Sequence, residues 1–126
     1  RQRQRAVCAG VLIMTATTHR ELLEGAARAC GHTFKWVTYN GVDTLYVLHT
    51  KEPKGDWQEW NSLHSMADCF EMETALRIEV HWYEDRVHVF NRGQPVTAAL
   101  FEEHNNDRKA ARMYASTRCA FEISKG

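Results

Sequence analysis

The dipeptide Asn40-Gly41 lies between two runs of β-branched and aromatic residues, FKWVTY before it and VDTLYVLH after it. Asparagine and glycine tolerate the positive φ angles that a two-residue hairpin turn requires, and the flanking residue types favour strands. The pattern predicts an antiparallel hairpin over residues 34–49. Because a lone hairpin is at best marginally stable in water, the rest of the chain has to supply a layer that covers its apolar face.

A second hairpin is predicted over RIEVHWY-ED-RVHVF, with Glu84-Asp85 as its turn residues. In this register His81 faces His88 on one side of the pair, and on the opposite side Trp82 faces Val87 and Val80 faces Val89. The segment NRGQP then turns the chain, and VTAALF predicts a further short strand.

Three segments carry the signals of amphipathic helices. The first, roughly residues 19 to 30, begins with a capping box of Thr18 and Glu21 and ends before Gly31. Its expected buried residues are Leu22, Leu23, Ala26, Ala27 and Cys30.

The second helix is expected to begin near Ser62 or Ser65 and to reach about Ala75, and the last to follow a cap at Asn106 or Asp107. The expected buried side of the second helix consists of Leu63, Met66, Ala67, Phe70 and Thr74. That of the last helix consists of Ala110, Met113, Tyr114, Thr117 and Phe121.

The predicted order of elements is α-β-β-α-β-β-(β)-α. One-sided helices and alternating strands in this order predict an α+β layered sandwich, with a mainly antiparallel sheet of hairpins and three helices. The 126 residues fit one domain, and their apolar fraction of 44% and charged fraction of 25% are typical of a globular protein. No repeat or interdomain linker is evident.

The N-terminal stretch RQRQRAVCAGVLI differs from the rest of the chain, since it has neither an acidic residue nor helical periodicity. We interpret residues 1–13 as a non-native or disordered leader and residues 14–126 as the domain. The apolar run in this stretch is too short to cross a bilayer, and a cleaved signal peptide is the weaker interpretation.

Charge and cysteine content bear on partners and compartment. The 16 basic and 16 acidic residues balance, so no overall field attracts nucleic acid or an anionic membrane. Removal of the three arginines in residues 1–13 leaves 13 basic against 16 acidic residues, a net charge of −3. The four cysteines are spread singly and form no CxxC pair, which fits the cytoplasm of a host cell better than a secreted protein.

The stretch WNSLHSMADCFEMETALRIEV, residues 60–80, resembles part of a family of small bacteriophage and prophage proteins, those with the phage ABA sandwich domain. In that family a Trp-Asn pair leads through Ser/Thr-rich residues into an amphipathic helix and a short strand; Ser62 stands here where the family usually has proline. ATTHRELLEGAARACG and DRKAARMYASTRCAFEISKG resemble its opening and closing helices. The resemblance implies a layered fold and a phage origin, and it implies no catalytic residue.

Within DWQEWNSLHSMADCFEME, the residues His64, Asp68 and Cys69 suggest a nucleophile with its base and orienting carboxylate. On a helix, positions 64 and 68 share a face, but position 69 is turned about 100° away from 68. A buried thiol stays protonated and inert, so we favour helix caps and core packing over catalysis for these residues.

The same stretch supplies the candidate partner-binding residues Trp57, Trp60, Asn61 and His64. Tryptophan is enriched at binding hot spots, so any tryptophan left exposed is a natural anchor for a protein partner. We expect an exposed patch that includes Trp57 or Trp60, in a monomer or a homodimer.

Two further sites are weaker candidates. His81 and His88 could share a metal ion across the second hairpin, with a third ligand from Glu79, His49 or His104, but none of these has a diagnostic spacing. No other residue set suggests a metal or a cofactor.

Arg108 and Arg112 lie one turn apart on the last predicted helix and could contact phosphates. Acidic neighbours make this basic surface thin for nucleic acid. The leading hypothesis is therefore a phage or prophage accessory protein that binds a host or phage macromolecule and is not an enzyme. A small metal-dependent hydrolase that uses His81 and His88, and nucleotide or nucleic-acid binding through the last helix, remain as alternatives.

Overall fold

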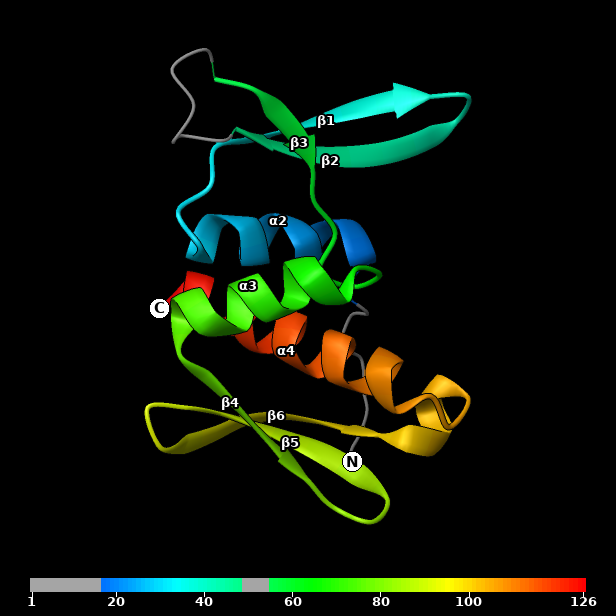
Figure 1. Ribbon diagram of the computed structural model, residues 1–126, viewed down its shortest axis with the longest axis vertical. Coiled ribbons are helices and arrows are strands. Elements are labelled where there is room, and N and C mark those ends of the chain that lie inside the picture. Colours follow the sequence, from blue (N-terminus) through cyan, green and yellow to red (C-terminus); the bar gives the residue numbers. More distant parts are fainter. Residues whose placement is uncertain (1–16, 49–54) are drawn as a thin grey trace, which may run out of the picture.

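The structure is a computed structural model that describes residues 17–48 and 55–126 (Figure 1). In chain order its elements are α2 (His19–Ala29), β1 (Phe34–Tyr39), β2 (Val42–Leu48), β3 (Trp57–Glu59), α3 (Met66–Leu76), β4 (Ile78–Trp82), β5 (Arg86–Asn91), β6 (Gln94–Leu100), the 3-10 turn η1 (Phe101–His104) and α4 (Arg108–Lys125). The predicted α+β class is confirmed. The predicted leader, residues 1–13, and the candidate ligand His49 lie outside the described residues.

The strands form two antiparallel sheets of three strands each, with the orders β1-β2-β3 and β4-β5-β6. Figure 1 shows the three helices as a layer between these sheets. Both sheets are meanders that lead into a helix, so the order strand-strand-strand-helix occurs twice in the described chain. Each sheet therefore has one face toward the helices and one face toward solvent.

Both predicted hairpins are confirmed in register. Asn40 and Gly41 occupy the first turn with φ angles of 52° and 76°. In the second hairpin His81 lies opposite His88. The strand β6 is confirmed, whereas β3 was missed because all three of its residues are exposed and show no alternation of burial.

The predicted helix starts are also confirmed. Thr18 and Glu21 form the capping box of α2. The side chain of Ser65 accepts a hydrogen bond from the backbone N–H of Asp68 at 3.2 Å, and Asp107 caps α4. These caps form because each links backbone and side chain within three residues, so they need no distant partner.

The helix α4 lies at the centre and contributes to two hydrophobic cores. Met113 and Ala120 pack in the core beneath β1–β3, while Ala111, Ala115 and Cys119 pack in the core above β4–β6. An amphipathic stripe was predicted for α4, but the helix is buried on more than one side because a sheet or helix lies on both sides of it. No helix in the described ranges is long and apolar enough to span a membrane.

The predicted buried side of α3 is wrong in part. Phe70 is 60% exposed, and Ala67 and Thr74 are also exposed. The buried residues of this helix are Cys69, Met72 and Glu73. On this inward side Cys69 and Met72 pack in the core and the carboxylate of Glu73 has its partners on α4, which the local sequence does not contain.

Candidate functional site

The two candidate tryptophans have opposite environments. The ring of Trp57, on β3, is part of the surface, with 38% of the residue exposed. Trp60 follows β3 and is 2% exposed, with its ring against His32 at a centroid distance of 5.5 Å. Trp60 therefore belongs to the core between the first sheet and the helices and is not part of an exposed binding surface.

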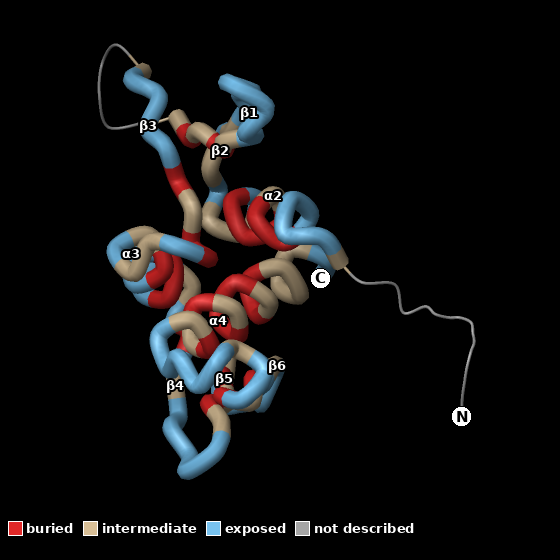
Figure 2. The backbone as a smooth tube through the Cα atoms, turned by 90° about the vertical axis from the view of Figure 1, so that its right-hand side faces the viewer, coloured by how far each residue is buried: buried red, intermediate tan, exposed pale blue. Residues whose placement is uncertain are grey.

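Trp57 belongs to an exposed sheet face that the sequence did not reveal as a unit. The register of β1, β2 and β3 places on this face, which we call the outer face, the side chains of Lys35, Val37, Tyr39, Val42, Thr44, Tyr46, Leu48, Trp57 and Glu59. Figure 2 shows β1 and β3 as largely exposed. The alternate residues Leu45 and Val47 are buried toward the helices, which confirms that the sheet has two distinct sides.

The outer face combines apolar side chains with a charged rim. Tyr39 is 75% exposed, Val42 62% and Val37 39%. The ammonium group of Lys35 lies 4.3 Å from the centroid of the Trp57 ring, a cation–π contact across the sheet. The contact joins a residue of β1 to a residue of β3 on the same face of the sheet.

The remaining two candidate partner-binding residues have local roles. The side-chain oxygen of Asn61 accepts hydrogen bonds from the backbone N–H groups of Leu63 and His64, at 3.0 and 3.2 Å. The ring of His64 is exposed and lies 6.4 Å from that of His19. Asn61 therefore shapes the loop before α3, while His64 lies at the surface near the start of α2.

The thiol site that was weighed for His64, Asp68 and Cys69, and judged weaker than helix capping and core packing, does not assemble in the described residues. The Asp68 carboxylate accepts a hydrogen bond from the backbone N–H of Asn61 at 2.9 Å, and no hydrogen bond or ion pair joins it to His64 among the described residues. Cys69 is fully buried, and burial together with the Glu73 carboxylate raises the pKa of its thiol to about 12. Such a thiol carries almost no thiolate at neutral pH.

A polar cluster that the sequence did not predict lies beneath the exposed surface between α3 and α4. Glu73 is 4% exposed and accepts hydrogen bonds from Arg112 Nε at 3.0 Å, Arg112 Nη2 at 2.6 Å and Ser116 Oγ at 2.6 Å. The thiol of Cys69 donates a longer bond, of 3.6 Å, to the same carboxylate. Every oxygen of the buried carboxylate is thus satisfied, as burial of a charge requires.

This cluster corrects the predicted nucleic-acid site. The guanidinium of Arg112 is held by Glu73, which raises the pKa of the arginine side chain through the hydrogen bonds it accepts. Arg108 lies over the ring of Phe101 at 4.8 Å. The two arginines are one turn apart as expected, but Arg112 is paired with Glu73, which weakens the case for the two as a basic footprint.

The histidine pair of the second hairpin packs against aromatic rings on the solvent side of its sheet. His81 lies 4.4 Å from the ring of Phe90, and His88 lies 4.7 Å from that of Tyr83, between centroids. His81 Nε2 is 3.4 Å from a Glu79 carboxylate oxygen. Across residues 17–48 and 55–126, no group of three His, Cys, Asp or Glu side chains is placed to hold a metal ion.

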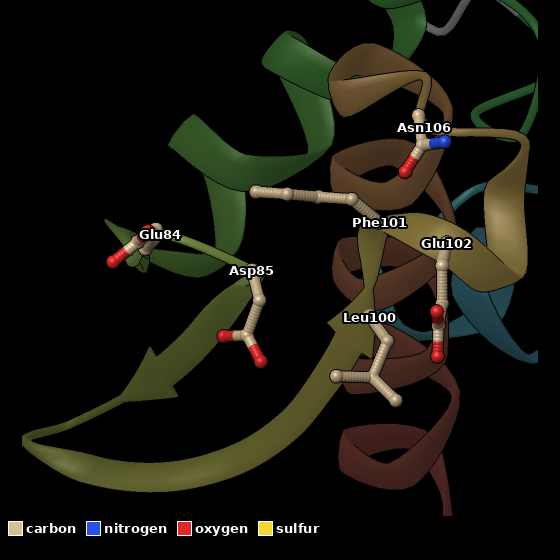
Figure 3. A pocket seen from close by; sticks show the side chains of 6 residues that line it. All are labelled: Glu84, Asp85, Leu100, Phe101, Glu102 and Asn106. Carbon is tan, nitrogen blue, oxygen red and sulfur yellow. The ribbon is translucent and has the colours of Figure 1, made fainter.

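A surface cavity of about 370 Å³ lies at one end of the second sheet (Figure 3). Its lining consists of Glu84, Asp85, Leu100, Phe101, Glu102 and Asn106. In Figure 3, Phe101 extends from η1 toward the β4–β5 turn. The carboxylate of Asp85 is already bound by Arg86 at 2.9 and 3.0 Å, so this opening is acidic but partly neutralised.

The outer face is thus the feature best suited to bind another molecule, and its sequence signal is the apolar character of both sets of alternate residues in FKWVTY-NG-VDTLYVL. Comparison of the chain with protein-family models, with curated proteins and with solved structures found no significant match. The resemblance to phage ABA sandwich proteins therefore remains a hypothesis that the quoted sequence stretches alone support.

Proposed function

We propose that this chain is a phage or prophage accessory protein that acts by binding a host or phage macromolecule, with no enzymatic step, through the outer face of β1–β3. The observation that carries this proposal is the exposure of Tyr39, Val42, Val37 and Trp57 on one side of a single sheet. Large contiguous apolar patches on the surface of monomeric proteins often mark interaction sites.

Side chains of α2 contact the sheet that bears the outer face from beneath. Trp36 Nε1 donates a hydrogen bond of 2.6 Å to Glu24 on α2, and the Arg20 guanidinium stacks on the Trp36 ring at 4.4 Å. Arg20 also pairs with Asp43 on β2 at 3.1 Å. A surface fixed in this way loses little conformational entropy when a partner binds, which favours affinity.

The nature of the face favours a protein as the partner. Tyrosine and tryptophan are enriched at protein–protein hot spots, and a polar rim such as Lys35 and Glu59 is usual around them. Lys35 is the only basic residue of the outer face as defined, so a nucleic-acid backbone would find little charge to neutralise.

The test is quantitative capture from the lysate of infected cells, with wild-type protein, the double variant Trp57→Ala/Tyr39→Ser, and the control Tyr83→Ser. Tyr83 is 48% exposed but lies at the end of the second hairpin, away from the first sheet. We expect the double variant to lose at least tenfold in affinity for a partner that the control still binds, because truncation of a hot-spot anchor costs about 2 kcal/mol or more.

Photo-crosslinking and a nuclease treatment complete the experiment. A photo-crosslinking residue placed at Val42 should join the chain to the same partner, while one placed at Tyr83 should not. If the captured partner binds the double variant as tightly as wild type, or is lost after nuclease treatment alone, then the outer face is not the protein-binding surface.

A further inference from the structure

A surface cavity of about 670 Å³ lies where α3, β5 and α4 end, at the opposite end of the second sheet from the acidic cavity. Figure 1 shows the end of α3 and the end of α4 close together at this corner of the molecule. The lining residues are Ala75, Leu76, Arg77, Asn91, Arg92, Ile123 and Gly126. Two of these residues have cationic side chains, and none has an acidic side chain.

The backbone of both arginines is unusual. Five residues other than glycine have a positive φ in the described chain: Asn40, Arg77, Arg92, Asn105 and Asn106. Three are asparagine, which tolerates this left-handed region, whereas arginine is disfavoured there. The two arginines are the exceptions, and both line the same cavity. Backbone strain of this kind persists mainly where a site needs the side chain in place.

Two turns of this chain share a backbone form but differ in the residue at their first position. Asn40-Gly41 has φ angles of 52° and 76°, and Arg92-Gly93 has φ angles of 56° and 76°. The two turns have the same backbone form, for which asparagine followed by glycine is the favoured pair. Arginine therefore stands at position 92 against the local preference of the turn. Arg77 likewise occupies the left-handed end of α3, where glycine is usual.

Neither guanidinium has a carboxylate partner within residues 17–48 and 55–126. Of the other arginines in the described ranges, Arg20, Arg86, Arg112 and Arg118 form ion pairs, whereas Arg28 and Arg108 lie over aromatic rings. The lining of the cavity thus includes two exposed arginines that form no ion pair with another described residue.

The helix dipoles oppose an anion here but are weaker than the two charges. Both α3 and α4 present their C-terminal ends to the cavity, each equivalent to roughly half a negative charge that acts only within the last turn. The two positive charges of the arginines exceed the combined negative charge of the two helix ends, which is about one unit. One cation near each helix end would be enough to offset the dipoles. Arg92 lies on a β-turn and on neither helix, so offsetting a helix dipole does not account for its position.

We propose that this cavity binds a small phosphate monoester, with Arg77 and Arg92 holding the phosphate group and the side chains of Leu76 and Ile123 contacting an apolar body. Two guanidinium groups match the charge of a phosphate dianion, and each can donate two parallel hydrogen bonds to its oxygens. The site is distinct from the outer face of β1–β3, and the proposal does not depend on the function proposed above.

The test is titration of the full chain with phenyl phosphate, inorganic phosphate and benzoate, followed by calorimetry and by amide chemical shifts in low-chloride buffer. Phenyl phosphate should bind saturably and more tightly than inorganic phosphate, and benzoate should bind at least tenfold more weakly than phenyl phosphate. Arg77→Gly and Arg92→Asn should each weaken phenyl phosphate binding at least tenfold, whereas the control Arg108→Ala should not change it.

The unliganded melting temperature separates this role from a structural one. Because glycine and asparagine suit the left-handed backbone, Arg77→Gly and Arg92→Asn should raise Tm by about 2–6 °C while they weaken binding at least tenfold. A structural role predicts the reverse, a lower Tm with binding unchanged. The proposal is overturned by that result, by an absence of saturable phenyl phosphate binding, or by benzoate binding as tightly as phenyl phosphate.

Discussion

Glu73 on α3 and Arg112 on α4 form a bidentate ion pair in which Arg112 Nε and Nη2 donate to the carboxylate at 3.0 and 2.6 Å. The carboxylate is almost completely buried, and Ser116 on α4 donates a further hydrogen bond to it. The pair joins the helix that follows the first sheet to the helix that packs on both cores. The pair is therefore a direct polar link between α3 and α4.

Glu73→Ala should destabilise the protein by about 3–5 kcal/mol, because the guanidinium of Arg112 would remain partly buried without its partner. The matched control is Glu122→Ala, since Glu122 pairs at 3.5 Å with Arg118 and with Lys125 at the surface. This second change should cost about 0–1 kcal/mol. Urea unfolding of both variants measures the difference. Equal losses of unfolding free energy would show that the buried pair contributes no more to stability than the surface pair.

Gly25→Ala should destabilise the protein, although alanine favours an isolated helix by roughly 0.5–1 kcal/mol over glycine. A Cβ at this position would lie 2.5 Å from Phe121 Cδ1 and 3.3 Å from Phe121 Cα, where α2 crosses α4. We expect a loss of about 1–3 kcal/mol from this overpacking in thermal unfolding. As a control, the same change in a peptide of residues 17–31 should raise helicity; increased stability of the whole chain would contradict the close approach.

Ser62 and Thr117 share a fully buried hydrogen bond of 2.8 Å between their hydroxyl groups, across the interface of the α3 loop with α4. Thr117→Val should cost about 1–3 kcal/mol because the hydroxyl of Ser62 loses its partner away from water. Adding Ser62→Ala removes that unsatisfied group and should restore part of the stability. A double-mutant cycle in urea measures the coupling, and purely additive losses would show that the two hydroxyls do not interact.

The buried thiols should make the protein less stable in alkaline solution. Burial raises the pKa of Cys69 to about 12 and that of Cys119 to about 11, from an ordinary value of 9.0. Above pH 9 the unfolded chain loses these protons while the folded chain keeps them, so stability falls as pH rises from 9 toward 11. The slope is about 1.4 kcal/mol per pH unit for each thiol.

The measurement is the unfolding free energy between pH 8 and pH 11 for wild type and for Cys69→Ala/Cys119→Ala. The double variant should show a shallower decline with rising pH, while lysine and tyrosine titrations affect both proteins equally. Parallel curves would mean that the two thiols titrate alike in the folded and unfolded chains.

The sequence alone was enough for the elements whose causes are local. Thr18 and Glu21, Ser65, and the turn at Asn40-Gly41 each form through contacts or φ preferences confined to a few neighbouring residues. For the same reason the register of the second hairpin followed from the position of its turn. These features require no knowledge of distant parts of the chain.

Only the tertiary structure decided which side chains are buried or free. Trp57 and Trp60 look alike in the sequence, yet one lies on the outer face and the other in the core. In the sequence Arg112 resembles a surface cation, but in the structure it pairs with Glu73 on α3. Arg77 and Arg92 come from separate elements and line the same cavity. Burial and ion pairing depend on residues brought together across long stretches of chain, so local periodicity and spacing carry no record of them.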